Sequence, residues 1–176
     1  PDASPEGCES VFGIAVPGVP NLHSHAFQRA MAGLAERATT NTDTFWSWRE
    51  RMYAFLERLG PEDIEAIAAQ LYVELLRHGF TSVTEFHYLR NHIDGSTYAD
   101  PVEMGQRILS AANQAGIGAT LLPVLYRSSD FGSKPPIPEQ RRFVAGVDEL
   151  VSDVAKLRDS VVNNPQYRIG LAIHSL

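Results

Sequence analysis

Two histidines separated by one residue are the part of this sequence best suited to chemistry. His23 and His25 lie in the segment NLHSH (21–25), which follows an apolar, proline-containing stretch and is predicted to end a short strand. Because side chains alternate along a strand, both imidazoles would point to the same side. Two imidazoles placed in this way can bind one Zn²⁺ or a similar divalent ion. A hydrogen-bonded histidine pair without a metal is the alternative interpretation.

The segments after this pair alternate between helical and strand patterns. A stretch dense in Ser, Gly and Pro at 127–138 predicts a surface loop. Apolar residues at helical spacing predict helices over 45–59, 61–78, 103–115 and 143–161. Runs rich in β-branched and aromatic residues predict strands over 80–86, 117–126 and 167–173, after the first strand near His25.

Strands separated by helices must run parallel, which predicts an α/β fold with helices covering a parallel sheet. A doubly wound sheet and a (β/α)₈ barrel both satisfy this order. Four strands in 176 residues are about half of a barrel of ~250 residues. In either fold, the chemistry belongs at the carboxyl ends of the strands, where His25 is predicted to lie.

Composition excludes several classes of function. The net charge of −6 and the pI near 5.5 provide no electrostatic basis for binding nucleic acid or an anionic membrane surface. Cys8 is the single cysteine, so no internal disulfide or cysteine-based zinc cluster can form, and a reducing, cytoplasmic location is expected. No apolar run reaches the ~18 residues of a membrane-spanning helix.

Several longer motifs surround the histidine pair. They are NLHSHAFQRAMAGLAE (21–36), FWSWRERMY (45–53), GFTSVTEFHYL (79–89), YADP (98–101) and LLPVLY (121–126). Over about residues 11 to 176, the chain resembles the amidohydrolase superfamily and, within it, the formimidoylglutamate deiminase family. This resemblance implies a (β/α)₈ TIM barrel of the amidohydrolase type, with about the first four β/α units in this chain. It also implies hydrolysis of N-formimino-L-glutamate to N-formyl-L-glutamate and ammonia during histidine degradation.

The resemblance further implies a role for individual residues. One divalent metal ion, most simply zinc, would be bound by His23 and His25. The substrate pocket would be lined by Gln28, Arg49, Tyr88 and His174. An arginine can hold a substrate carboxylate through a two-pronged hydrogen bond, and a phenol can donate to one. Each of the four also has an ordinary interpretation: an exposed glutamine, a solvated helix arginine, a half-buried tyrosine and a capped core histidine.

The remaining machinery of the superfamily would lie outside this sequence. The resemblance places a third histidine ligand on the fifth strand, an aspartate on the eighth, and the proton-transferring glutamate and histidine beyond Leu176, so no catalytic acid or base is expected here. We therefore expect the isolated 176 residues to lack deiminase activity and to bind zinc weakly. Residues 1–16 would be the tail of an N-terminal β-sandwich or a linker, and residues 17–176 the first half of the barrel. Exposed sheet edges would favour self-association, for example as a homodimer.

Two other functions compete with this one. The first is another metal-dependent deaminase that acts on a heterocycle, for which an anion-binding Arg49 would be unnecessary. The second is a non-catalytic α/β module in which the histidines are structural and the exposed sheet face binds a partner. Glu85 and His87 lie two residues apart on the second strand, so their side chains are expected on the same side of it. They are candidates only for positioning the residues of the site, not for contacting the metal or substrate.

Overall fold

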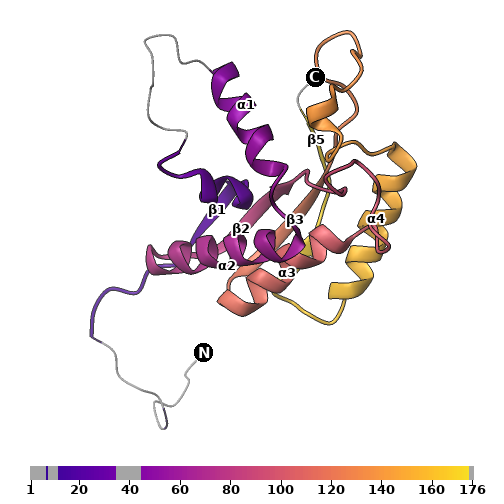
Figure 1. Ribbon diagram of the computed structural model, residues 1–176. Coiled ribbons are helices and arrows are strands. Elements are labelled where there is room, and N and C mark those ends of the chain that lie inside the picture. Colours follow the sequence, from indigo (N-terminus) through magenta and orange to yellow (C-terminus); the bar gives the residue numbers. More distant parts are fainter. Residues whose placement is uncertain (1–6, 8–11, 35–44, 175–176) are drawn as a thin grey trace.

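The computed structural model describes residues 7, 12–34 and 45–174 (Figure 1). Most of residues 1–16, assigned above to a separate segment, lie outside the described residues. The strands are β1 (Val19–Ser24), β2 (Phe80–His87), β3 (Gly118–Leu125), β4 (Tyr167–Ile169) and β5 (Ala172–Ile173). The helices are η1 (Ala26–Met31), α1 (Phe45–Leu56), α2 (Pro61–Arg77), α3 (Glu103–Ala115), η2 (Pro138–Gln140) and α4 (Val147–Val161), where η marks a 3₁₀ helix.

Every pairing between the described strands is parallel, which confirms the predicted fold class. The order across the sheet is β1-β2-β3-β4. Strand β5 also pairs with β3, closer to the carboxyl end of β3 than β4 does. Helices α2 and α3 lie side by side across the sheet, and α4 follows beside β4 (Figure 1). Apolar side chains on the outer strands stay exposed, including Leu22 at 72% and Ile173 at 67%. These features are those of a partial barrel.

The start of α2 shows how the sequence determines one of these helices. Pro61 occupies the first turn, where its missing N–H costs nothing. The Asp63 carboxylate accepts a hydrogen bond of 2.9 Å from the Gly60 backbone N–H. Ile64, Ala68 and Tyr72 then recur every four residues and are buried. This spacing places one apolar face of α2 against the sheet.

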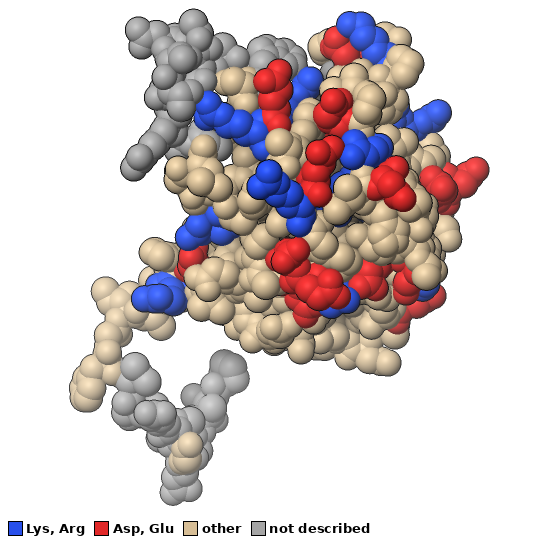
Figure 2. All heavy atoms as spheres, in the orientation of Figure 1, with Lys and Arg blue, Asp and Glu red and all other residues tan. Residues whose placement is uncertain are grey.

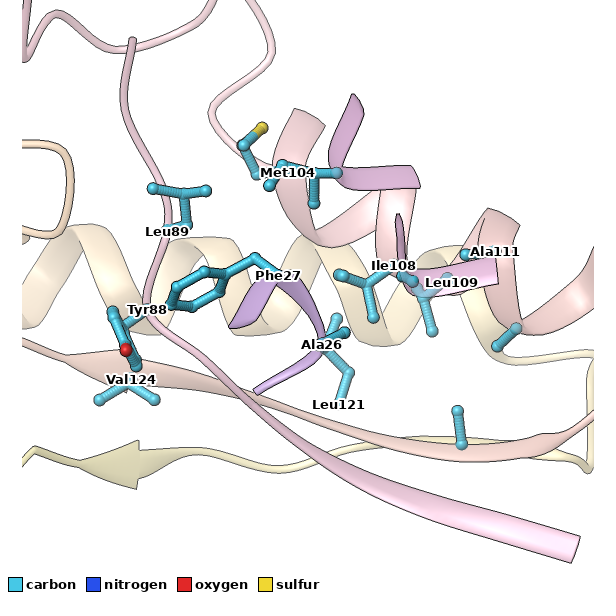
Figure 3. Packing of buried hydrophobic residues seen from close by; sticks show 14 of the residues in the cluster. Ala26, Phe27, Tyr88, Leu89, Met104, Ile108, Leu109, Ala111, Leu121 and Val124 are labelled. Carbon is cyan, nitrogen blue, oxygen red and sulfur yellow. The ribbon is translucent and has the colours of Figure 1, made fainter. Parts of the chain in front are cut away.

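The core fills the space between the sheet and its helices (Figure 3). Ile108 of α3 and Leu121 of β3 are almost completely buried, and each contributes roughly 1.5–3 kcal/mol by leaving water. At the carboxyl end of the strands, the ring of Phe27 packs edge-on against Tyr88 with centroids 5.4 Å apart. The core therefore reaches the edge of the sheet where functional residues were predicted.

Acidic and basic side chains are interspersed over the face that carries α2 and α3 (Figure 2). Arg107 of α3 illustrates this arrangement, because it contacts Glu62, Glu65 and Glu103 at 2.8–3.0 Å. These groups are partly exposed, so each pair contributes at most about 1 kcal/mol. No described helix is both long enough and apolar enough to cross a membrane.

Helix α1 lies beyond the carboxyl ends of β1 and β2 rather than alongside the sheet (Figure 1). The buried guanidinium of Arg142 holds its C-terminal end in this position. Arg142 donates to the backbone carbonyls of Leu56, of Leu59 at 2.9 Å and of Asn91 at 3.1 Å. The last carbonyls of a helix lack partners within the helix, so a buried cation stabilises them well.

The predicted helix over 143–161 begins later than expected, at Val147. Phe143 has the spacing of a helix residue, but its N–H closes a turn onto the Gln140 carbonyl at 2.9 Å. The helix starts after Gly146, whose N–H donates to the Glu149 carboxylate at 2.7 Å. Short η2 overlaps only the end of the loop predicted over 127–138. Phe143 lies outside α4, and its ring packs against those of Tyr53, Tyr88 and Tyr126.

The predicted strand over 167–173 is divided into β4 and β5. The break falls at Gly170, whose N–H donates to the Leu121 carbonyl at 3.0 Å. A Cβ atom at this position would lie 2.7 Å from a Leu122 methyl carbon, so a larger residue would require the Leu122 side chain to move. Both strands still pair with β3, and the chain therefore continues toward the same edge of the sheet.

Candidate active site

Four ring-bearing residues meet at the carboxyl edge of the sheet because each directly follows a strand. His25 follows β1, Tyr88 follows β2, Tyr126 follows β3 and His174 follows β5. Ring centroids are 5.4 Å apart for His25 and Tyr88, 5.7 Å for Tyr88 and His174, and 4.3 Å for Tyr126 and His174. Parallel strands that end together therefore assemble this site from residues up to 149 positions apart, the separation of His25 and His174.

The histidine pair converges as predicted from strand alternation. The Nε2 atoms of His23 and His25 lie 3.0 Å apart. The Nδ1 atom of His25 lies 3.0 Å from the Phe86 backbone oxygen, which can only accept, so Nδ1 carries the hydrogen of that bond. In the neutral ring, the Nε2 lone pair of His25 is then directed toward His23. Burial lowers the pKa of His25 and favours this neutral form.

These two nitrogens fit two positions of a metal site. Two nitrogens bound to one tetrahedral zinc at about 2.0–2.1 Å would lie roughly 3.3 Å apart. The observed separation of 3.0 Å is close to this value. Neutral imidazole, with its second nitrogen hydrogen-bonded to a backbone carbonyl, is the usual form of a histidine ligand. Among the described residues, no group of three or more histidine, cysteine, aspartate or glutamate side chains converges on one point.

The histidines open into a cavity of about 580 Å³ between the sheet edge and α1. This volume is typical of small-molecule sites. The walls are largely aromatic, with polar groups at intervals. They are formed by His23, His25, Gln28, Trp48, Arg49, Met52, Tyr53, Phe86, Tyr88, Tyr126, Ser128, Ser129, Asp130, Phe131, Phe143 and His174.

All four predicted pocket residues line this cavity together with the histidine pair. Gln28 of η1 donates through its amide to the Tyr88 phenol at 3.3 Å. The Arg49 guanidinium of α1 lies 5.7 Å from the centre of the Tyr53 ring. The functional roles of these four residues remain predictions. Arg49 is partly buried on α1 and lines the cavity.

Sequence reasoning missed Tyr53, Tyr126 and Phe143, which also line the cavity. Tyr126 could have been found, because it holds the same position after its strand as Tyr88 does. Tyr53 follows Arg49 by four residues and therefore shares its face of α1. No sequence pattern indicated Phe143 as a cavity residue, because its spacing matched the apolar residues of the helix that begins after it.

Glu85 supports the histidine pair from the helix-covered side of the sheet. It is buried, and its carboxylate accepts 2.6 Å and 3.2 Å hydrogen bonds from the Ala26 backbone N–H and the Tyr72 hydroxyl. Ala26 directly follows His25, so these contacts hold the backbone where the chain leaves β1. Burial raises the pKa of Glu85 to about 7, and the bonds from Ala26, Ser24 and Tyr72 partly oppose this rise.

The raised pKa of Glu85 predicts a pH-dependent contribution to stability. Its pKa moves from 4.5 to about 7 on folding, so the folded state holds this proton more tightly. The contribution is fully present below pH 4.5 and is lost as the pH rises through about 7. Glu85→Gln should remove this dependence, as measured by urea unfolding at about pH 5 and pH 8. Exposed Glu50→Gln is the matched control, and parallel profiles for wild type and Glu85→Gln would contradict the prediction.

His87, the other predicted supporting residue, lies apart from this cavity. It lines a separate space of about 30 Å³ beside Asp153 and Leu157. Its Nε2 atom has no hydrogen-bond partner among the described residues, and burial lowers its pKa to about 4. A space of this size is large enough for one water molecule, which would satisfy this nitrogen.

Most of the chain matches a known protein family. The model of the amidohydrolase family matches residues 14–162. The chain belongs to the amidohydrolase family. The resemblance inferred from the motifs around the histidine pair is thereby confirmed.

Among individual amidohydrolases, formimidoylglutamate deiminase from Pseudomonas aeruginosa is 52% identical over all 176 residues, which cover 39% of its length. A crystal structure of an amidohydrolase from Brucella melitensis superimposes with a TM-score of 0.86 at 48% identity, covering 90% of this chain and 36% of that one. An atrazine chlorohydrolase from Arthrobacter aurescens, solved in complex with zinc, has a TM-score of 0.69 at 22% identity over 91% of this chain and 35% of its own. This amidohydrolase chain is thus a homologue of formimidoylglutamate deiminase and spans well under half of its relatives' length.

Proposed function

We propose that this chain forms the metal-binding and substrate-binding part of a hydrolase that converts N-formimino-L-glutamate to N-formyl-L-glutamate and ammonia. The observation that carries the proposal is the convergence of the His23 and His25 Nε2 atoms, 3.0 Å apart, at one cavity that also holds Arg49. The 52% identity to the Pseudomonas deiminase supports the choice of substrate. Residues 17–176 would be the first half of the catalytic barrel.

His23 and His25 would hold one divalent ion, most simply zinc. When bound, such an ion acts as a Lewis acid and makes water a stronger nucleophile near neutral pH. His25 is prepared for this role because the Phe86 carbonyl fixes its ring and leaves Nε2 facing His23. The buried Glu85 carboxylate keeps the following backbone in place through Ala26. Metal binding therefore requires little rearrangement of the chain.

Arg49, Gln28, Tyr88 and His174 would bind and orient the substrate. A glutamate-like molecule carries two carboxylates, and a guanidinium binds a carboxylate through two parallel hydrogen bonds. The Gln28 amide and Tyr88 phenol, bonded to each other at 3.3 Å, offer a fixed polar pair on the same wall. Aromatic walls exclude water around these groups, which strengthens their interactions with a charged ligand.

The test is product formation by the zinc-loaded protein, using the whole polypeptide in which these residues occur, whatever its length. We expect ammonia and N-formyl-L-glutamate in equal amounts from N-formimino-L-glutamate, and no product after the metal is removed with a chelator. An aminotriazine is the comparison substrate, because it represents the competing heterocycle deaminases. Preferential release of ammonia from the aminotriazine would overturn the proposed substrate. Zinc-free protein of unchanged stability would favour a non-catalytic module.

A further inference from the structure

Gln140 is a buried amide whose orientation is determined by its backbone neighbour. It ends η2 and has no exposed surface. Its Oε1 atom accepts a 3.0 Å hydrogen bond from the Ile137 backbone N–H, which can only donate. The Nε2 group must therefore face the opposite way. There it donates to the Tyr53 phenol at 3.1 Å and to the Tyr126 phenol at 2.7 Å.

Counting hydrogens in this cluster leaves the phenol hydrogens without an acceptor on Gln140. Both Nε2 hydrogens of Gln140 go to phenol oxygens, so neither phenol can donate its own hydrogen to Gln140. The phenol O–H groups therefore remain for a partner other than Gln140. Burial raises the pKa of Tyr126, so its hydroxyl keeps its hydrogen at neutral pH.

The two phenols belong to the wall of the cavity that holds the histidine pair. Tyr53 and Tyr126 both line that cavity, and the Arg49 guanidinium lies 5.7 Å from the Tyr53 ring centre. A phenol O–H beside a guanidinium is suited to a carboxylate, which accepts from both. Had the Gln140 amide been reversed, its oxygen would draw the phenol hydrogens away from the cavity.

We propose that Gln140 is a positioning residue that directs one phenol O–H of the Tyr53–Tyr126 pair toward a carboxylate of the ligand. One carboxylate of the proposed substrate would then be held at this end of the cavity by Arg49 and a phenol. This inference deepens the proposed function and rests on it for the identity of the substrate. It assigns a part in specificity to Gln140, Tyr53 and Tyr126, none of which was among the predicted pocket residues.

The test inverts the polarity of the amide without changing its shape. Gln140→Glu keeps an oxygen for the Ile137 N–H but replaces the donor with an acceptor, which would take the phenol hydrogens. At slightly alkaline pH, we expect the Kd for N-formyl-L-glutamate to rise at least tenfold, the scale of one hydrogen bond to a charged group. KM should rise similarly, with kcat within about twofold. The Kd for the uncharged diamide of the same ligand should not change.

Two further variants separate hydrogen-bond direction from the added charge. The double variant Tyr53→Phe and Tyr126→Phe removes both phenol groups and should raise the Kd for N-formyl-L-glutamate to a similar degree. Adding Gln140→Glu to it should then cost no more than about twofold, because the donor is already absent. Gln166→Glu introduces the same charge at an exposed position and should leave every Kd unchanged. All measurements use the zinc-loaded, full-length polypeptide.

The outcomes decide the inference separately from the proposed reaction. The inference would be overturned if Gln140→Glu left the Kd for N-formyl-L-glutamate unchanged, or if it raised the Kd for the diamide equally. It would also be overturned if the rise in Kd in the triple variant equalled the product of the rises in Gln140→Glu and in the phenol double variant. If Gln140→Glu does not fold, the phenol double variant decides by the same comparison of dicarboxylate with diamide. A wild type that binds N-formyl-L-glutamate without hydrolysing N-formimino-L-glutamate would refute only the proposed reaction. A wild type that binds neither N-formyl-L-glutamate nor glutarate would refute both.

Discussion

Replacing His23 or His25 with alanine is expected to remove stoichiometric zinc from the protein. Structural zinc sites bind with about 10–16 kcal/mol, so one of four ligands accounts for roughly 2.5–4 kcal/mol, or about 10²- to 10³-fold in Kd. Their Nε2 atoms lie 3.0 Å apart and can share one ion only when both rings are present. Loss of His25 should have the larger effect, because the Phe86 carbonyl already fixes that ring.

Zinc content after dialysis and competition with a chromogenic chelator would measure this effect in the full-length polypeptide. His78→Ala is the matched control, because His78 is exposed at the C-terminal end of α2 and does not line the cavity. Its zinc content should equal that of the wild type. Wild-type zinc affinity in both His23→Ala and His25→Ala would show that the pair is structural, as in the non-catalytic alternative.

Replacing Arg49 with alanine is expected to raise KM for N-formimino-L-glutamate by roughly 10- to 150-fold. A hydrogen bond between charged groups is worth about 1.5–3 kcal/mol, which converts to this range. Arg49 projects from α1 into the cavity beside the Tyr53 ring, so its loss removes a cation from the wall. Arg49→Lys should recover only part of the affinity, because an ammonium group cannot form the parallel pair of bonds.

Steady-state kinetics of the zinc-loaded polypeptide would measure the Arg49 effect. Arg58→Ala is the control, because Arg58 is exposed just after α1 and does not line the cavity. A substrate with both carboxylates amidated should show the same KM in wild type and Arg49→Ala. An unchanged KM for N-formimino-L-glutamate in Arg49→Ala would favour a heterocycle as the true substrate.

Local rules were sufficient for most of the helices and strands and for the histidine pair. Pro61, Asp63 and the spacing of Ile64, Ala68 and Tyr72 predict α2 without any knowledge of the sheet. Alternation along a strand predicts that His23 and His25 face the same side. Such patterns are encoded within a few residues, so sequence analysis can find them.

The supporting contacts of the site could not be predicted in this way. Glu85 and Ala26 are 59 residues apart, and Gln140 and Tyr53 are 87 apart. No periodicity connects such pairs, because their distance depends on how the strands and α1 are packed. The late start of α4 has the same cause, since Phe143 fits the helical spacing but packs among cavity residues.

The sequence by itself determined the parallel α/β class, the strand that presents the histidines and the motifs of the amidohydrolase family. These features depend on residue type and spacing, which are local properties of the chain. Only the tertiary structure decided that residues following β1, β2, β3 and β5 meet α1 around one cavity. It also decided the direction of the Gln140 amide. The physical reason is that a hydrogen bond requires two groups within about 3 Å. Segments that are distant in the sequence reach this separation only through folding.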